Sequence, residues 1–516
     1  MNKKGFTLVE LLAVIAILAI LVIIALPNVL KMYNDSKKNA FMTEAQNLAK
    51  EVSSKYISES MKGNKVTVIS NKQNPLDMTG RELEYNFELD SQGKIKNMIV
   101  SNGTYCISTN KDYTKITRDD ISDKCSYNDL YKTVGTLKNK FYEESGRTDR
   151  SLVSSIVFYS DGRTINGAES YDVSEKKDGS IKMYVSQNTE NTSLLDLTIV
   201  ANGKIDLPKD SSELFKFYQR YAYSYYGANL QNLQFNNSIS TFNVTNMKDM
   251  FSYSKVATLD LSSFNTSKVT DMSYMFDSSK ATEIKGLNKF NTSNVTNMSQ
   301  MFFDSKVTTL DLSSFDTSNV EYMEEMFFNS AAVEIKGLNH FNTSKVISMS
   351  SMFNGSKAAT LDLSSFDTSN VTKMGLMFCS SAATEIKGLN KFNTSKVTNM
   401  GGMFSFSKAT TLDLSSFDTS NVESMAEMFN GSAATEIKGL NHFNTSKVSS
   451  MSSMFTGSKV ATLNLSSFDT SNVTLVNMSE IFRNSAATTG YARTQADADK
   501  FNNSSNKPSS LTFVVK

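Results

Sequence analysis

The second half of the chain repeats itself with a fixed period, and this constrains its fold more than any other feature. Val residues, most of them closing the segment Phe-(Asn/Asp)-Thr-Ser-X-Val, recur ten times from Val244 to Val473, at intervals that alternate between 25 and 26 residues. Periods of this size are typical of solenoids, in which each repeat buries its apolar side against the next one. The sequence therefore predicts a stacked array of about ten coils over residues 239–482.

Each repeat has the same internal pattern. The Val is followed by Met three and six residues later and by Phe seven residues later, as Met272, Met275 and Phe276 illustrate. This spacing fits one face of a helix, and the Thr-Ser-Asn side chains before it are typical of a helix start. A short strand follows, and Gly286 adds the extra residue of the longer repeat, as a bulge or a tight turn. We therefore expect one strand and one or two helical turns per coil, with strands about 4.8 Å apart in a parallel ladder roughly 45 Å long.

The outward position of the predicted strands alternates in charge along the array. Opposite charges on neighbouring strands stabilise a sheet by about 0.2–1 kcal/mol per pair. We interpret the alternation as a means of keeping the strands in register, and its neutral average argues against a ligand bound by charge. The residues are Asp260, Lys285, Asp311, Lys336, Asp362, Lys387, Asp413, Lys438 and Asn464.

The array resembles the BspA-like leucine-rich-repeat surface proteins of bacteria. The likeness rests on the repeated segments Leu-Asp-Leu-Ser-Ser-Phe-Asp-Thr-Ser-Asn-Val and Met-X-X-Met-Phe, and it covers residues 239–482. It implies a right-handed leucine-rich-repeat-like parallel β solenoid and a role in adhesion. Residues 483–516 resemble the closing segment of that family, which predicts a helix and a terminal strand that cap the open end of the array.

The N-terminus carries a second constraint. A basic pair and Gly5 precede an apolar run, Phe6–Leu26, which has the length that a helix needs to cross a membrane, about 20 residues. The basic pair before the run places the cytoplasm on that side. Glu10 lies inside the run, where an ionised side chain costs roughly 2.5 kcal/mol or more, so a functional reason for it is expected. A plain anchor helix is the alternative.

The segment Lys-Lys-Gly-Phe-Thr-Leu-Val-Glu-Leu-Leu resembles the leader of type IV pilins and pseudopilins. In that family a prepilin peptidase cuts after the Gly, here Gly5, and the new first residue, here Phe6, is N-methylated. Glu10 corresponds to the carboxylate used in assembly. It lies four residues from Phe6 and hence on the same helix face, where it can pair with the new amine of its own chain or of a neighbouring subunit. Pro27 matches a helix kink frequent in these proteins. The implied partners are prepilin peptidase, other pilins and the cytoplasmic membrane.

The chain is therefore expected to be an α+β multidomain protein of 516 residues. We expect a leader at 1–5, a membrane and stem helix at 6–60, a small pilin-like α+β head at 61–130, a β-rich bridging segment with the N-terminal cap at 131–238, the array at 239–482 and the C-terminal cap at 483–516. Strands are predicted at 83–89, 94–100, 151–160 and 194–200, and a capping helix at 211–229. The apolar face of the stem helix is predicted to comprise Leu30, Met32, Tyr33, Phe41, Ala45, Leu48, Ala49, Val52 and Tyr56.

Cysteine usage adds one further expectation. Cys106 and Cys125 bracket a short loop, and an extracellular head lies in an oxidising compartment, so a disulfide is expected, with two free thiols as the alternative. Pilin heads often carry such a loop, which supports the pairing by resemblance alone. Cys379 has no partner for catalysis nearby and is interpreted as a stray thiol.

Composition and motifs argue against an enzyme. The net charge of +1 provides no basic surface for nucleic acid, and no phosphate-binding, dinucleotide-binding or catalytic motif is found. His340 and His442 occupy positions that hold Lys in sister repeats, and they are too far apart to share a metal ion. No cofactor or metal is therefore expected. The repeated Asp316, Asp367 and Asp418 could bind calcium but are better explained as turn caps.

These observations predict a minor pilin-like protein of the cell membrane, the extracellular surface or the pilus, which presents the array to an unknown surface ligand or host protein. The two alternatives are a membrane-anchored surface protein that does not polymerise and a pseudopilin of a type II secretion or competence system. Candidate adhesive residues are the variable positions Tyr274, Gln300, Tyr322 and Leu376.

Overall fold

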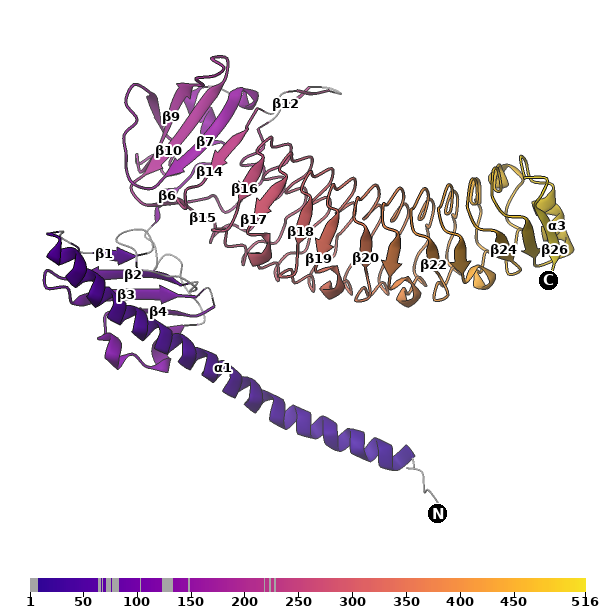
Figure 1. Cartoon of the computed structure of the whole chain (residues 1–516), viewed down its shortest axis with the longest axis horizontal. Coiled ribbons are helices and arrows are strands. Elements are labelled where there is room, and N and C mark those ends of the chain that lie inside the picture. The colour runs from indigo at the N-terminus through magenta and orange to yellow at the C-terminus, as the bar shows by residue number, and fades with distance from the viewer. Residues whose placement is uncertain are drawn as a thin grey trace. The chain divides into compact units, whose positions relative to one another are not determined.

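The computed structural model describes residues 8–63, 83–102, 104–122, 133–146, 149–217 and 229–516, with short stretches at 66, 68–70, 76, 219–221 and 224–226. The chain divides into two compact units, residues 1–132 and residues 133–516 (Figure 1). A long helix belongs to the first unit, and the repeats belong to the second.

The first unit packs the helix α1 (Leu8–Met61) on a five-stranded antiparallel sheet. Between residues 41 and 52 the helix buries side chains at helical spacing against the apolar face of the sheet. The buried helix residues are Phe41, Ala45, Leu48, Ala49 and Val52. In sheet order the strands are β1 (Val68–Ser70), β2 (Glu84–Leu89), β3 (Ile95–Ser101), β4 (Cys106–Thr109) and β5 (Ile121–Ser122), and the 3-10 turns are η1 (Tyr113–Lys115) and η2 (Arg118–Asp120).

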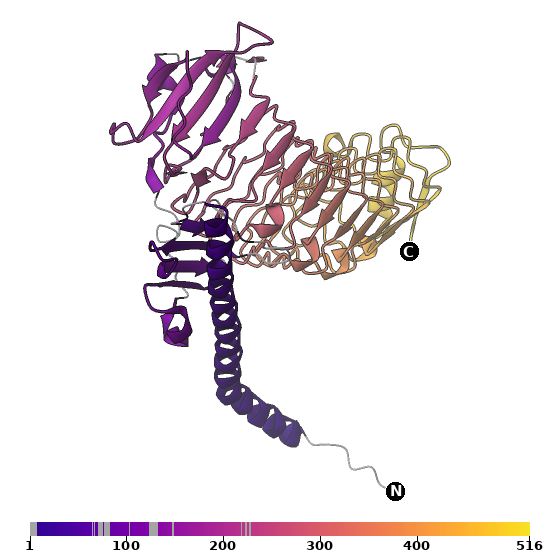
Figure 2. The same ribbon diagram turned by 60° about the vertical axis from the view of Figure 1, so that its left-hand side comes forward.

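Helix α1 differs from its prediction at one described position. Met32 is 73% exposed, because the packed stripe begins only at Phe41. The side chains of Leu30 and Tyr33 lie outside the described residues. The helix continues through Pro27, and Figure 2 shows it bent in its N-terminal part, as expected from a helix kink there.

Within the described part of the chain, no helix is long and apolar enough to span a membrane. The predicted membrane segment, Phe6–Leu26, enters α1 at Leu8, but its side chains lie outside the described residues, so this expectation stays a prediction.

The second unit begins with a mixed five-stranded sheet of order β14-β7-β10-β9-β8. Strand β10 pairs in parallel with β7 and antiparallel with β9. The strands of this sheet are β7 (Val153–Tyr159), β8 (Glu169–Asp172), β9 (Ile181–Gln187), β10 (Leu195–Ala201) and β14 (Asn232–Gln234). A separate three-stranded sheet has the order β15 (Ile239–Ser240), β11 (Lys204–Asp206) and β6 (Thr133–Thr136), and the 3-10 turns η3 (Phe141–Ser145) and η4 (Arg150–Leu152) precede β7. The strands predicted at 83–89, 94–100, 151–160 and 194–200 are thus present as β2, β3, β7 and β10.

The helix predicted at 211–229 is absent from the described residues there. Residues 212–215 form a turn, and β12 (Gln219–Tyr221) and β13 (Ser224–Tyr226) form a hairpin. The turn backbone bonds to the first repeat: the Ser211 and Phe215 amides donate to the carbonyls of Asn246 and Met250 at 3.0 and 3.1 Å. The array therefore begins before residue 239, with a partial repeat that covers the first full one.

Successive repeats are joined by parallel backbone pairing (Figure 1). One residue per repeat bridges to its equivalent in the next, without a break from Asp210 to Ser450. The short strands pair in twos: β16 (Thr258–Asp260) with β17 (Glu283–Lys285), β18 (Thr309–Asp311) with β19 (Glu334–Lys336), β20 (Thr360–Asp362) with β21 (Glu385–Lys387), and β22 (Thr411–Asp413) with β23 (Glu436–Lys438). The 3-10 turns η5 (Leu287–Lys289), η6 (Leu338–His340), η7 (Leu389–Lys391), η8 (Leu440–His442) and η9 (Val476–Met478) complete the array.

The helical turns predicted for the Met-X-X-Met-Phe segments are wrong. These segments are turns in which one residue between the two Met residues has a positive φ, as Tyr274 does at 60°. The amide of Tyr274 donates to Ser299 of the next repeat, whereas that of Met275 turns back to Met272. Every second amide thus donates its hydrogen bond to the neighbouring repeat, whereas in a helix the amides bond within the same segment. The Met and Phe side chains still point inward, so their spacing could not distinguish the two conformations.

Stacked aromatic rings fill the interior of the array. The Phe that ends each turn lies over its equivalent, as Phe327 does, with ring centroids 5.8 Å from Phe302 and 5.4 Å from Phe353. Offset stacks in this range contribute about 0.5–1.5 kcal/mol per pair beyond burial. The column runs through Phe215, Phe251, Phe276, Phe302, Phe327, Phe353, Phe378, Phe404, Phe429, Phe455 and Phe482.

The Gly of each longer repeat makes the predicted tight turn. Gly286 has a φ of 88°, and a Cβ there would lie 2.7 Å from the Ser262 backbone. The charged strand residues are in register as predicted, for example Asp311 with Lys336. The carboxylate of Asp311 nevertheless accepts hydrogen bonds from Ser313, so it caps a turn as well as facing a Lys. Because the strands pair in twos, the alternation does not form one continuous charge ladder.

The C-terminal cap has the predicted helix and strand. The helix α3 (Gln495–Asn502) lies beside the parallel sheet β24 (Thr462–Leu465), β25 (Thr489–Ala492) and β26 (Thr512–Val515). Phe501 and Phe513 lie 5.6 and 4.8 Å from the last ring of the column, Phe482. The buried carboxylate of Asp497 accepts hydrogen bonds from the amide and hydroxyl of Thr470. The end of the apolar column is therefore covered.

Candidate functional site

The predicted processing site lies outside the described residues. Gly5 and Phe6 precede the first described residue, Leu8. Glu10 belongs to the helical backbone of α1, but the structure does not describe its side chain. The processing and assembly roles of these three residues stay predictions.

The predicted disulfide between Cys106 and Cys125 also stays a prediction. Cys106 is buried at the start of β4, where its sulfur lies 3.8 Å from the Ser122 carbonyl oxygen. Cys125 lies outside the described residues. Strand β5 ends at Ser122, which brings the chain next to Cys106 three residues before Cys125.

The variable residues of the array collect on one side, which we call the turn edge. In the second repeat it comprises residues 271–278. This segment begins at Asp271, which bridges to the neighbouring repeats, and ends at Ser278, the second of its two residues with a positive φ. The equivalent segments of the other repeats also belong to the turn edge. The Met and Phe residues of each segment are buried, most of the others are half-buried or exposed, and a few polar residues such as Ser273 and Asp277 are buried as well. A left-handed conformation costs a non-Gly residue about 1 kcal/mol, and it recurs along the array.

The structure places all four predicted adhesive residues on the turn edge. Tyr274, Gln300 and Leu376 occupy the same position of their repeats, directly before the second Met, with φ between 57° and 60°. Tyr322 is a bridging residue. Tyr322 and Leu376 are 42% and 43% exposed, whereas Tyr274 and Gln300 are half-buried.

Sequence reasoning missed a concentration of acidic and aromatic side chains in the third and fourth repeats. The rings of Phe303 and Phe328 stack at 4.6 Å on the turn edge, half-buried. The carboxylate of Glu324 accepts a hydrogen bond from the Ser299 hydroxyl, and Asp304 pairs with Lys306 at 2.7 Å. We call this group the acidic–aromatic cluster. It consists of Phe303, Asp304, Tyr322, Glu324, Glu325 and Phe328.

A signal for this cluster was present in the sequence. At the position of Phe303 and Phe328, later repeats have Asn354, Ser405 and Thr456. Comparing equivalent positions across repeats therefore separates the interior, which hardly changes, from the turn edge, which changes from repeat to repeat.

Carboxylates gather around this part of the turn edge. Burial raises the pKa of Asp277 to about 6, and the neighbouring Asp249 and Asp304 also raise it. Burial, followed by the charge of Glu324, raises the pKa of Glu325. Each of these shifts means that the carboxylate is less favourable when ionised here than in water. A cation at this surface would relieve that cost.

The remaining candidates have local structural roles. His340 and His442 are exposed at the ends of η6 and η8. The carboxylate of Asp316 accepts a hydrogen bond from the Ser318 amide, and Asp367 and Asp418 make the equivalent turn caps. Cys379 is half-buried beside Ser380. In the described part of the chain, no group of three potential ligands could hold a metal ion.

Comparison with known proteins gives matches for the N-terminal segment and for the repeat array. Residues 1–26 match the prokaryotic N-terminal methylation motif, which is the substrate signal for prepilin peptidase and indicates a pilin-like surface protein. Residues 228–308, 275–387 and 381–494 match the family described as "Mycoplasma protein of unknown function, DUF285". Neither curated proteins nor solved structures give a match. Because its three matches together span residues 228–494, more than half of the sequence, the chain belongs to the DUF285 family.

Proposed function

We propose that this protein is a minor pilin-like component of the cell surface, which presents a repeat array for adhesion or protein–protein interaction. The observation that carries the proposal is the union in one chain of a prepilin-type motif and a stacked array with a variable turn edge. In this proposal the array is a right-handed leucine-rich-repeat-like solenoid of the BspA-like kind, and Phe6–Leu26 holds the protein in the membrane before assembly.

The proposed contact surface is the turn edge, with the acidic–aromatic cluster as its centre. Aromatic side chains at an exposed surface, with charged groups around them, are typical of the residues that dominate binding energy at protein interfaces. Tyr322 supplies an exposed ring, and Phe303 and Phe328 supply a half-buried pair. We propose binding and not catalysis as the activity, because the polar groups of the repeats are used in turn caps and hydrogen bonds between repeats.

The assembly role is tested with the substitution Glu10→Ala in the full-length chain. We expect cleavage after Gly5 to persist, which N-terminal sequencing would show, and the amount of protein in sheared filaments to fall. Glu44→Ala, a carboxylate on the same helix beyond the membrane segment, is the matched control and should leave both unchanged. Normal incorporation of the Glu10→Ala variant would contradict the assembly role of Glu10, and absence of the unsubstituted protein from sheared filaments would favour the simple membrane-anchored alternative.

A further inference from the structure

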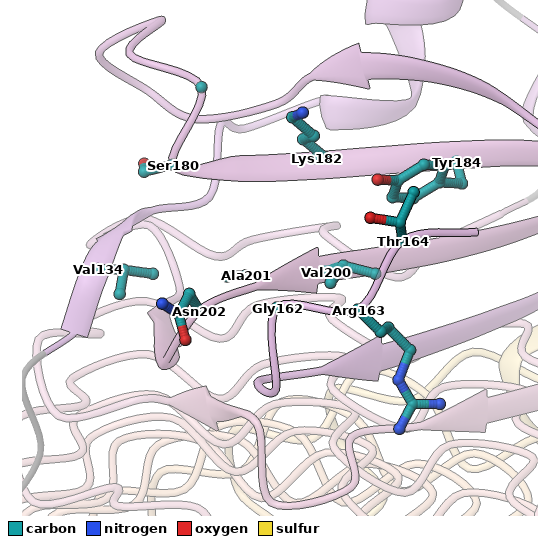
Figure 3. A pocket seen from close by; sticks show the side chains of 11 residues that line it. Val134, Gly162, Arg163, Thr164, Ser180, Lys182, Tyr184, Val200, Ala201 and Asn202 are labelled. Carbon is teal, nitrogen blue, oxygen red and sulfur yellow. The ribbon is translucent and has the colours of Figure 1, made fainter. Parts of the chain in front are cut away.

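The mixed sheet before the array has a cavity on its outer face (Figure 3). The cavity has a volume of about 370 Å³. Its floor is formed by β9 and β10, and the loop that follows β7 forms a wall. It is separate from the turn edge, so a ligand here would not depend on the proposed function.

The loop that forms the wall is held in place by several contacts. The Gly162 amide donates to the Ala201 carbonyl at 2.9 Å. The Arg163 guanidinium donates to both carboxylate oxygens of Asp161 and lies 3.6 Å from the centre of the Tyr159 ring. The Arg163 hydrogen bonds lower the pKa of Asp161 to about 2, so the pair persists in mild acid. The wall is therefore organised before a ligand binds, which reduces the entropic cost of binding.

The polar groups around the cavity fit an anion with hydroxyl groups. Among the described residues that line it, none is Asp or Glu. Lys182 is exposed and makes no ion pair within the described part of the chain, whereas Arg163 is already paired. Figure 3 shows the hydroxyls of Thr164 and Tyr184 turned to the same side, with the Arg163 guanidinium pointing away from them.

Further residues of the lining add polar and apolar surface, among them Ser180, whose buried hydroxyl has no hydrogen-bond partner in the described part of the chain. Asn202 brings an amide that can both donate and accept hydrogen bonds, and Val200 contributes a small apolar surface to the floor. Among the described residues, the lining offers one Lys without an ion pair, three hydroxyls (Thr164, Ser180 and Tyr184) and one amide, and a cavity of this size with these groups favours a small ligand over a chain.

We propose that this cavity binds a small ligand with one carboxylate and several hydroxyl groups, the chemistry of an acidic sugar. Lys182 pairs with the carboxylate, and the hydroxyls of Thr164 and Tyr184 and the amide of Asn202 bond to the ligand hydroxyls. The chain would then recognise two kinds of target, a protein surface through the turn edge and an acidic sugar through this cavity.

The test is saturation-transfer difference NMR on the full-length protein with glucuronate, glucose, acetate and inorganic phosphate as separate probes. We expect glucuronate to bind about tenfold more tightly than glucose or either simple anion, because it alone satisfies both the cation and the hydroxyls. Lys182→Gln should weaken glucuronate binding about tenfold, and Tyr184→Phe, which removes only a hydroxyl, about fivefold. Lys176→Gln, an exposed Lys outside the lining, is the matched control and should leave binding unchanged.

Three results would overturn the proposal. The first is no glucuronate signal with the unmodified protein. The second is equal binding of acetate or phosphate, which would mean a simple anion site. The third is equal loss in the Lys182→Gln and Lys176→Gln variants, which would mean that the general charge of the surface, and not the cavity, attracts the ligand.

Discussion

The interior and the turn edge of the array belong to the same segments of chain but differ in how much they vary. Inside, Val, Met, Met and Phe recur in nearly every repeat and are almost completely buried. On the turn edge, one position alone holds Tyr274, Gln300, Glu325, Ser351 and Leu376. The backbone at that position is the same in each case, with φ between 54° and 60°. The array thus separates the residues that determine its fold from those that are free to determine what it binds.

The sharpest test of this difference uses two neighbouring Phe residues. Phe327 is fully buried in the aromatic column, whereas Phe328 is half-buried on the turn edge. We expect Phe327→Ala to lower the free energy of unfolding by about 3–5 kcal/mol, the usual cost of deleting a buried ring. Phe328→Ala should cost about 1 kcal/mol, since only part of its surface is buried. Chemical denaturation measures both, and equal losses would contradict the distinction between interior and edge.

A second test compares two Gly residues with positive φ. A Cβ at Gly337 would lie 2.7 Å from the Leu312 backbone, whereas at Gly457 the nearest atom would lie 3.7 Å away. We expect Gly337→Ala to lower the free energy of unfolding by about 3 kcal/mol, because backbone must move as well as adopt a strained conformation. Gly457→Ala on the turn edge should cost about 1 kcal/mol for the conformation alone. If thermal unfolding gave the same loss for both, the close approach at Gly337 would not matter.

The buried carboxylate of Asp277 predicts a dependence of stability on pH. Its pKa is raised from 3.8 to about 6, so the folded protein binds this proton more tightly than the unfolded chain does. The contribution of Asp277 to stability should therefore rise as the pH falls through about 6 and level off below about 4, where the unfolded chain is also protonated, whereas turn-cap carboxylates such as Asp316 contribute the opposite trend. Asp277→Asn should remove this dependence and stabilise the protein at pH 7 by about 3 kcal/mol. Asp316→Asn is a control at an ordinary turn cap, where the Ser318 hydrogen bonds lower the carboxyl pKa. Urea titrations at pH 4 and pH 7 measure the stability of the unsubstituted protein and of the Asp277→Asn variant, and the same change between the two pH values in both proteins would contradict a contribution from Asp277.

The smallest effect is expected where the turn edge adopts its left-handed conformation. Gln300 has a φ of 57°, and its equivalent in a later repeat is Gly402, with a φ of 61°. Gln300→Gly should raise the free energy of unfolding by up to about 1 kcal/mol, because Gly adopts this conformation without strain. Gln300→Ala, which keeps the strain, is the control. A loss of stability with Gly relative to Ala would show that the side chain and not the backbone conformation decides the energy at this position.

Much of the array could be predicted from its period, because repeats of 25 and 26 residues with fixed apolar positions leave little choice but stacking. The conformation of the Met-X-X-Met-Phe segments could not. Spacings of three, six and seven residues place side chains on one side in a helix. They do so also in these turns, where the residue directly before the second Met has a positive φ. The helix predicted at 211–229 failed for a related reason: its apolar residues, such as Phe215, extend the aromatic column through a partial repeat.

The candidate site was predicted in part. Four variable residues of the turn edge were identified, two of them exposed, but the acidic–aromatic cluster was missed, because stacking between Phe303 and Phe328 is evident only when repeats are superposed. Alternating charges were expected to form one ladder, but the strands pair in twos. In addition, Asp311 lies opposite a Lys of the paired strand and its carboxylate also caps a turn.

The central claim is that a prepilin-type chain carries this array to the cell surface, and immunogold labelling of sheared filaments with an antibody against the repeats tests it most directly. The account predicts gold on filament shafts or tips. Gold confined to the cell membrane, with unlabelled filaments, would contradict a pilin-like role and leave a membrane-anchored surface protein.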